Sequence, residues 1–142
     1  SIYEGTSGIQ ALDFLKRKIR ADKGSTLNTL LVLVHAETGS RNNVFSVPLQ
    51  ETIAILEQTL SHILETENSA EEGAYALLQL TGLVVHGWNG HCLYAAASQQ
   101  SEYQLRLRAS LQFFAADMTN TAQVWSAKAC RSLPDYRFSA DD

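Results

Sequence analysis

The sequence contains few residues that break helices, with two prolines and eight glycines among 142 residues. Because proline removes a backbone donor and glycine is costly inside a helix, this scarcity favours an all-α protein. Charged residues are also few, at 18%, and the net charge is −4. A negative chain is repelled by phosphate backbones and anionic headgroups, so we expect neither nucleic acid nor a membrane surface as its main partner.

Several catalytic motifs are missing too. The sequence has no GxSxG, Walker A, GxGxxG or HExxH pattern, and no two histidines have the i, i+4 spacing of a helical metal pair. We expect the histidines to be hydrogen-bonded polar groups within or between helices; they are His35, His62, His86 and His91. The two cysteines, Cys92 and Cys130, form no CxxC, and no secretory signal is visible. Buried, unreactive thiols in a reduced cytoplasmic protein are therefore expected.

No Asp, Glu, Lys or Arg occurs from Gly73 to Ser101. Such a segment is either a membrane span or a helix buried on most sides. Gln79, His86 and Asn89 interrupt it, so we predict the central helix of a bundle and no membrane span. Its small residues would let neighbouring helices approach closely; they are Gly82, Gly87, Gly90 and Ala95 to Ala97.

Other segments carry apolar residues at helical spacing. The run from Thr26 to Thr38 is too continuous to separate a helix from a buried strand, but its surroundings favour a helix. Pro48 opens the next helix, whose stripe is Leu49, Ile53, Leu56, Leu60, Ile63 and Leu64. A cap at Ser101 precedes the last stripe, which is Tyr103, Leu107, Leu111, Phe114, Met118, Ala122, Trp125 and Ala129. Helices joined by short loops predict an up-and-down four-helix bundle preceded by a short helix.

The beginning of the chain combines an acid with a helix start. Glu4 lies between an aromatic residue and a glycine, and Ser7 followed by Gln10 has the form of a capping box, so a helix should begin near Gly8. Helix N-termini bind anions because their free N–H groups and the helix dipole converge there. We interpret this stretch as a possible acid/base carboxylate beside a possible phosphate site. Ser69 and Glu72 form a second capping-box pattern further along.

The helix that follows has one apolar face, formed by Ile9, Leu12, Leu15 and Ile19. Phe14 points roughly away from that face, which suggests that the helix is covered on both sides. A basic cluster from Lys16 to Lys23 ends the helix. It could contact phosphate, or it could be a solvated C-terminal turn that complements the helix dipole.

From Ile2 to Ile19 the chain resembles the C-terminal end of the acyl-CoA dehydrogenase catalytic domain. The matching pattern is YEGT-x-GIQALD-x-L-x-RK, which looks like the branch with an appended, acetyl-CoA dehydrogenase-like helical C-terminal domain. The remainder is similar to that appended domain in length, in its uncharged third helix and in the segment from Leu107 to Asp117. The resemblance divides the chain into the end of a catalytic domain (1–23), a helical bundle domain (24–134) and a tail (135–142).

The resemblance implies a specific chemistry. Enzymes of this family oxidise an acyl-CoA thioester to the 2-enoyl-CoA, with a glutamate removing the α-proton while hydride passes from the β-carbon to N5 of FAD. Glu4 matches that base and Gly5 the substrate-contacting glycine. Thr6, Ser7 and Gly8 match the turn that contacts FAD. The implied partners are the acyl-CoA substrate, an electron-transfer flavoprotein or similar acceptor, and further copies in a homo-oligomer.

The family's N-terminal helices, its β-domain and most of its flavin site have no counterpart in these 142 residues, and the chain begins without methionine. We therefore expect it to be a C-terminal piece of such an enzyme, structural and inactive alone. A second hypothesis is a stand-alone helical module for interaction or oligomerisation, suggested by Phe14 and the small-residue helix. A third, DNA association, predicts salt-dependent binding that the negative charge disfavours.

Overall fold

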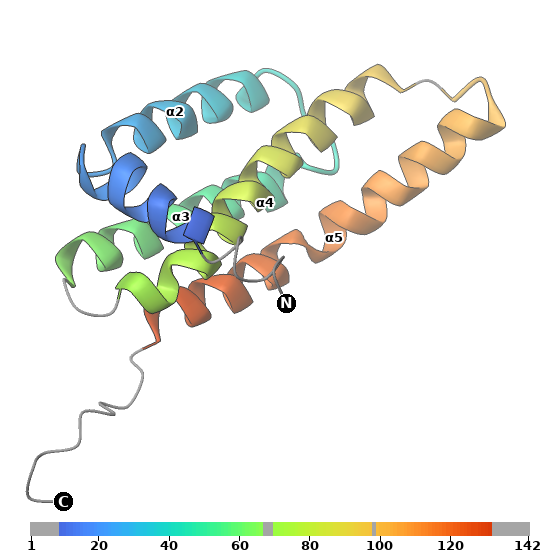
Figure 1. Cartoon of the computed structure of the whole chain (residues 1–142). Helices are drawn as coiled ribbons and strands as arrows, with labels where there is room; N and C mark the ends of the chain where they lie inside the picture. The colour runs from blue at the N-terminus through green and yellow to red at the C-terminus, as the bar shows by residue number, and fades with distance from the viewer. Residues whose placement is uncertain (1–8, 67–69, 98, 132–142) are drawn as a thin grey trace, which may run out of the picture.

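The computed structural model describes residues 9–66, 70–97 and 99–131. Residues 9–13 are α-helical and continue directly into a π-helical segment. The elements are η1 (Phe14–Arg20), α2 (Ser25–Gly39), α3 (Ser46–Glu65), α4 (Ala70–Ala96) and α5 (Glu102–Cys130). Successive helices from α2 to α5 run in alternating directions (Figure 1). The predicted all-α, up-and-down bundle is confirmed, and the described residues contain no strand.

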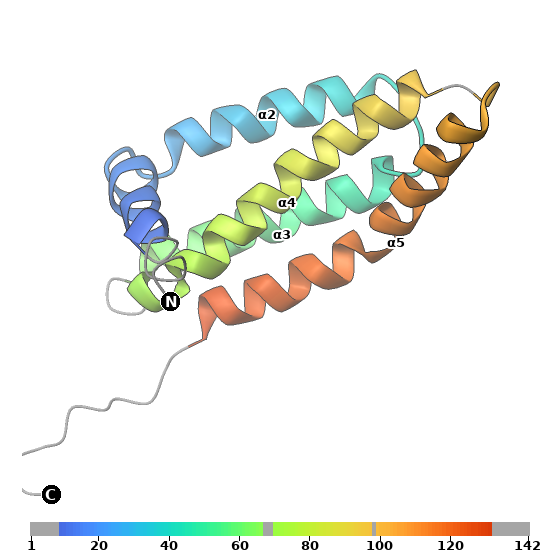
Figure 2. The same ribbon diagram turned by 45° about the vertical axis from the view of Figure 1, so that its right-hand side comes forward.

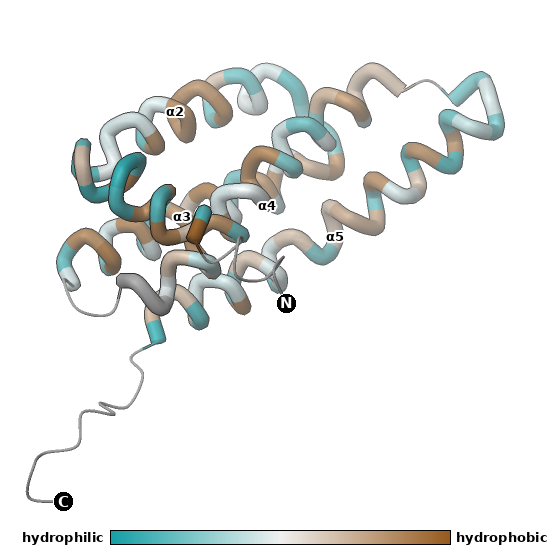
Figure 3. Tube along the Cα trace, viewed as in Figure 1, coloured by the Kyte–Doolittle hydropathy of each residue, from teal (hydrophilic) through white to brown (hydrophobic). Residues whose placement is uncertain are grey.

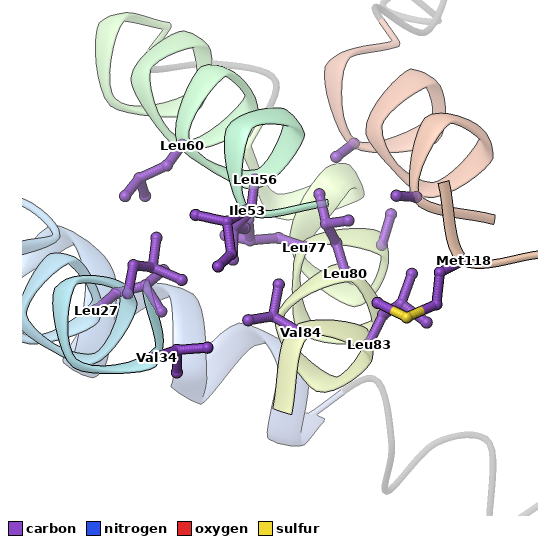
Figure 4. Close-up of a cluster of buried hydrophobic side chains, with 14 of the residues drawn as sticks. Leu27, Val34, Ile53, Leu56, Leu60, Leu77, Leu80, Leu83, Val84 and Met118 are labelled. Atoms are coloured by element: carbon purple, nitrogen blue, oxygen red, sulfur yellow. The ribbon is translucent and has the colours of Figure 1, made fainter. Parts of the chain in front are cut away.

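The core lies where α3, α4 and α5 pack together, and α2 and η1 cover one side of it (Figure 2). Leucine and valine side chains from α2, α3 and α4 converge there, and Met118 joins them from α5 (Figure 4). Burying each such side chain stabilises the fold by about 1.5–3 kcal/mol. The predicted stripe of α3 is confirmed: Leu49, Ile53, Leu56, Leu60 and Ile63 are buried, and Leu64 is half-buried.

The last stripe is confirmed from Leu111 onward, since Leu111, Phe114 and Trp125 are partly buried against the core. Met118, Ala122 and Ala129 are buried, whereas Tyr103 is 75% exposed and residues 102–114 include no buried residue. The expectation that Tyr103 faces the core is wrong, because this end of α5 packs mainly beside the end of α4. Figure 2 shows that α5 also bends near its middle. The cap at Ser101 is confirmed, since its side chain accepts a hydrogen bond from the Gln104 N–H at 3.2 Å.

The first helix packs into the same core as the bundle. Ala11, Leu15 and Ile19 are at most 1% exposed and belong to the cluster that includes α2, α3 and α4. We expected Ile9 on the buried face of this helix, but Ile9 is 70% exposed. The buried face instead runs through Ala11, Leu15 and Ile19. Phe14 is half-buried against the core. The domain boundary after residue 23 stays a prediction.

Two of the predicted close approaches are present in α4. A Cβ at Gly87 would lie 2.5 Å from Met118 Cε, and one at Gly90 would lie 2.6 Å from Phe45 Cζ. Gly82 has no such neighbour within 4 Å, so the prediction is wrong there. Among the described residues, no helix has the length and apolar character needed to span a membrane.

Candidate functional site

The residues that the sequence assigns to chemistry lie outside the described part of the chain. These are the base Glu4, the substrate contact Gly5, and the FAD-contacting turn Thr6, Ser7 and Gly8. The predicted capping boxes that begin at Ser7 and Ser69 also lie outside it. The structure first shows the chain at Ile9, inside the helix that follows the motif. The site is therefore built from the helix that follows Glu4 and the contacts that hold it.

That helix is anchored to the bundle at its C-terminal end. Leu15 and Ile19 are buried, and the Gly24 N–H donates to the Ile19 carbonyl oxygen at 2.8 Å. Arg20 donates from Nη2 to the Thr66 carbonyl oxygen at 3.2 Å, which ties the helix to the end of α3. Apolar burial and a cationic hydrogen bond thus set the direction of the helix relative to α3 and α4.

Asp22 organises the turn between this helix and α2. Its carboxylate accepts hydrogen bonds from the N–H groups of Gly24 and Thr26, both at 3.0 Å, and from the Thr26 hydroxyl. Those hydrogen bonds, led by the Thr26 hydroxyl, lower the pKa of Asp22 below its ordinary value. Lys23 and Gly24 have positive φ of 56° and 78°. Glycine suits position 24, because it adopts this conformation at little cost and because a Cβ there would lie 3.0 Å from Leu60 Cδ2.

Two arginines of the basic cluster bond to other residues of the same chain. The Nε of Arg17 lies 2.9 Å from Oδ1 of Asp13, one helical turn earlier, and Arg20 bonds to Thr66. Figure 3 shows the cluster as a hydrophilic stretch at the end of the first helix. Since the pair of Arg17 with Asp13 is largely exposed, it stabilises the helix only weakly. The interpretation as a solvated helix end accounts for these observations without a bound phosphate.

A shallow hollow of about 430 Å³ lies between α2 and α3. Leu31, Ile53 and other apolar side chains form most of its wall, and His35, Gln50 and Glu57 stand around them. His35 and Glu57 are both exposed. The hollow can accept an apolar group, and its polar side chains are exposed to solvent rather than enclosed in it.

The histidines and cysteines do not gather into a reactive group. Within the described ranges no cluster of three or more His, Cys, Asp or Glu could hold a metal ion. Cys92 is exposed and Cys130 is half-buried, so the expectation of buried thiols is wrong for Cys92. Burial raises the pKa of the Cys130 thiol, partly offset by a hydrogen bond with Ser126, which favours the unreactive protonated form.

The expectation that the histidines are hydrogen-bonded polar groups is confirmed for His91, although its partner in a loop was not predicted. It is 3% exposed, and its Nε2 donates to the Arg41 carbonyl oxygen at 3.0 Å. Asn43 donates from Nδ2 to the His91 carbonyl oxygen at 3.1 Å, and its Oδ1 accepts from the Phe45 N–H. These bonds attach the loop between α2 and α3 to α4. The residues are far apart in sequence, so no local pattern could have predicted their contact.

The chain is similar in sequence to part of a known protein. The chain is 34% identical over 97 residues to 3-methylmercaptopropionyl-CoA dehydrogenase of Ruegeria pomeroyi. The match covers 61% of this chain and 16% of the relative, so the chain spans only a small part of the length of the protein it resembles. No protein-family model matches the chain, and no solved structure matches it significantly.

Proposed function

We propose that the chain forms the C-terminal part of an FAD-dependent acyl-CoA dehydrogenase. Two features support this: the motif from Ile2 to Ile19, and the similarity to a protein named as a dehydrogenase of an acyl-CoA. The small share of the relative that the match covers agrees with a chain that supplies one segment of a larger enzyme. The agreement between motif and relative carries the proposal.

In this proposal Glu4 is the base that removes the proton α to the thioester carbonyl, and Gly5 contacts the substrate. Thr6, Ser7 and Gly8 contact FAD, and the bound flavin supplies the acceptor for the hydride that leaves the β-carbon. A carboxylate that removes such a proton works best when it is shielded from water, because burial brings its pKa closer to the operating pH. The shielding comes from the remainder of the parent enzyme, so the isolated chain is structural and inactive.

The test is Glu4→Gln in the parent enzyme, which keeps the side-chain size and removes the base. We expect thioester oxidation to fall by about 10²–10⁴-fold or more, while the bound flavin per protomer stays unchanged. The substrate named for the relative, 3-methylmercaptopropionyl-CoA, is the first acyl-CoA to assay. Glu57→Gln, an exposed position on α3, is the matched control and should keep full turnover. Full turnover in the Glu4 variant would refute the assignment of the base.

A further inference from the structure

The outer face of α5 carries a second stripe, apolar except for Asn120, that the bundle does not cover. It consists of Leu105, Ala109, Phe113, Ala116, Asn120, Val124 and Ala127, all exposed. Phe113 is 81% exposed, Val124 53% and Leu105 50%. These residues lie on the opposite side of α5 from Met118 and Ala122, which face the core. In both views α5 forms one edge of the bundle (Figures 1 and 2).

The spacing of the stripe keeps it straight along the helix. Successive members are four, four, three, four, four and three residues apart. This spacing is an eleven-residue repeat, which corresponds to about 3.67 residues per turn. Since a straight α-helix has 3.6 residues per turn, the stripe drifts little from Leu105 to Ala127 and is about 33 Å long. No charged residue belongs to the stripe, whereas Arg106 and Asp117 lie along one border of it. A helix that is apolar on both faces is typical of a helix packed between two layers.

We propose that this stripe binds the same stripe of a second copy, with the two α5 helices antiparallel about a two-fold axis beside Ala116. The stripe is self-complementary in that arrangement. Leu105 lies opposite Ala127 of the second copy, and Phe113 lies opposite Asn120. Each large side chain therefore faces a smaller one. Ala116 meets its own counterpart, where a small side chain lets the helices approach closely.

Charge supports the same register. Glu102 at one end of the stripe lies opposite Arg131 at the other end of the second copy, and both residues are exposed. Within one copy Glu102 already pairs with Arg106, its Oε1 lying 2.5 Å from Nη2. The carboxylate can accept both cations, since it offers about four lone-pair sites. Because the contact involves one helix from each copy, we expect a dimer that dissociates in the micromolar range.

Sedimentation of the 142-residue chain between about 1 and 200 µM tests the dimer. We expect the mass to double across this range. Phe113→Glu should abolish the increase without changing the melting temperature, because Phe113 contributes little to the fold of one copy. Tyr103→Glu, a change at an equally exposed aromatic residue off the stripe, should leave the dimer intact. A monomer at every concentration overturns the proposal and leaves the stripe as a surface for the rest of a longer chain.

Cross-linking tests the two-fold axis separately. In a Cys92→Ser background, Ala116→Cys should give a disulfide-linked dimer on oxidation, because the axis brings the two thiols together. Ala109→Cys should not, since the two copies of that position are about 21 Å apart along the helices in an antiparallel pair. Equal cross-linking of both variants would indicate parallel helices and overturn the arrangement. These measurements do not involve flavin or thioester, so the dimer and the proposed dehydrogenase function can fail independently.

Discussion

At the scale of single residues, the turn at Asp22 shows how a short sequence pattern fixes the start of a helix. The Asp22 carboxylate, just before α2, accepts hydrogen bonds from two backbone N–H groups and one hydroxyl. Helix starts leave N–H groups without partners, so such a side chain stabilises the helix. The four-residue spacing from Asp22 to Thr26 was visible in the sequence, yet only the turn geometry of Lys23 and Gly24 brings the two side chains together.

Asp22→Asn removes the charge and keeps the side-chain shape. Because the folded state lowers the pKa of Asp22, the ionised carboxylate stabilises the fold at neutral pH. That stabilisation is lost as the pH falls below the ordinary value of 3.8 through the lowered pKa. We therefore expect the free energy of unfolding of the two proteins to differ at pH 7 and to converge in acid.

Denaturant titrations at a series of pH values measure this convergence. Thr26→Val, which removes the hydroxyl donor at nearly constant size, should abolish part of the pH dependence. A difference between wild type and Asp22→Asn that is equal at all pH values would contradict the prediction.

Two glycines of α4 make a matched pair of substitutions. A Cβ at Gly73 would lie 2.3 Å from the backbone oxygen of Ala129, whereas a Cβ at Gly82 meets nothing within 4 Å. We expect Gly73→Ala to destabilise the protein by about 1–3 kcal/mol, because α4 and α5 must move apart. Gly82→Ala should stabilise it by about 0.5–1 kcal/mol through the lower conformational entropy of the unfolded chain.

Thermal and denaturant unfolding of both variants gives the comparison. A Gly73→Ala variant as stable as wild type would mean that α4 and α5 are farther apart than this structure places them.

At the scale of elements, the first helix belongs to the core of the bundle. Ile19 is fully buried and Leu15 nearly so, although the resemblance assigns residues 1–23 to the end of a catalytic domain. In a parent enzyme, this packing would join the helix that follows Glu4 rigidly to the appended bundle. The resemblance concerns the evolutionary origin of this helix, whereas its burial concerns packing. The packing can be measured directly.

Ile19→Ala tests whether the first helix and the bundle unfold together. We expect a loss of about 2–5 kcal/mol from the cavity created in the core, with a single unfolding transition. Amide hydrogen exchange should accelerate throughout α3 and α4 as well as in the first helix. Faster exchange confined to residues 9–20 would show an independent unit. Ile9→Ala is the control on the same helix: at 70% exposure, it should change stability by less than about 0.5 kcal/mol.

At the scale of the whole molecule, our proposal assigns the shielding of Glu4 and most of the flavin site to a longer parent enzyme. We expect the purified 142 residues to show no visible flavin absorbance after incubation with FAD. They should also leave 3-methylmercaptopropionyl-CoA unchanged when an artificial electron acceptor is present. Stoichiometric binding of flavin, or oxidation of the thioester, would contradict the proposal that the chain is a structural segment. Unchanged circular dichroism of the same sample serves as the control for folding.

Much of the fold was predictable because it depends on local periodicity. The stripe of α3 and the cap at Ser101 follow from side chains three or four residues apart, and such neighbours always share a helix face. The helix predicted for the run from 26 to 38 is confirmed as α2, although its continuous apolar pattern also fits a buried strand. The candidate site was predictable only as a motif, because Glu4 and its neighbours carry a family resemblance. The contacts of His91 and Asn43 were not predictable, because they join distant parts of the chain.

By itself, the amino-acid sequence determined the helical class, the order of the helices and the motif that suggests acyl-CoA chemistry. These properties rest on backbone propensity, short-range spacing and residue identity. Only the tertiary structure decided which apolar faces are buried. Along α5 both sides are apolar, and the side of Met118 packs inward while the side of Phe113 stays exposed. The physical reason is that burial depends on which helices lie next to a face, and a periodic pattern does not specify its neighbour.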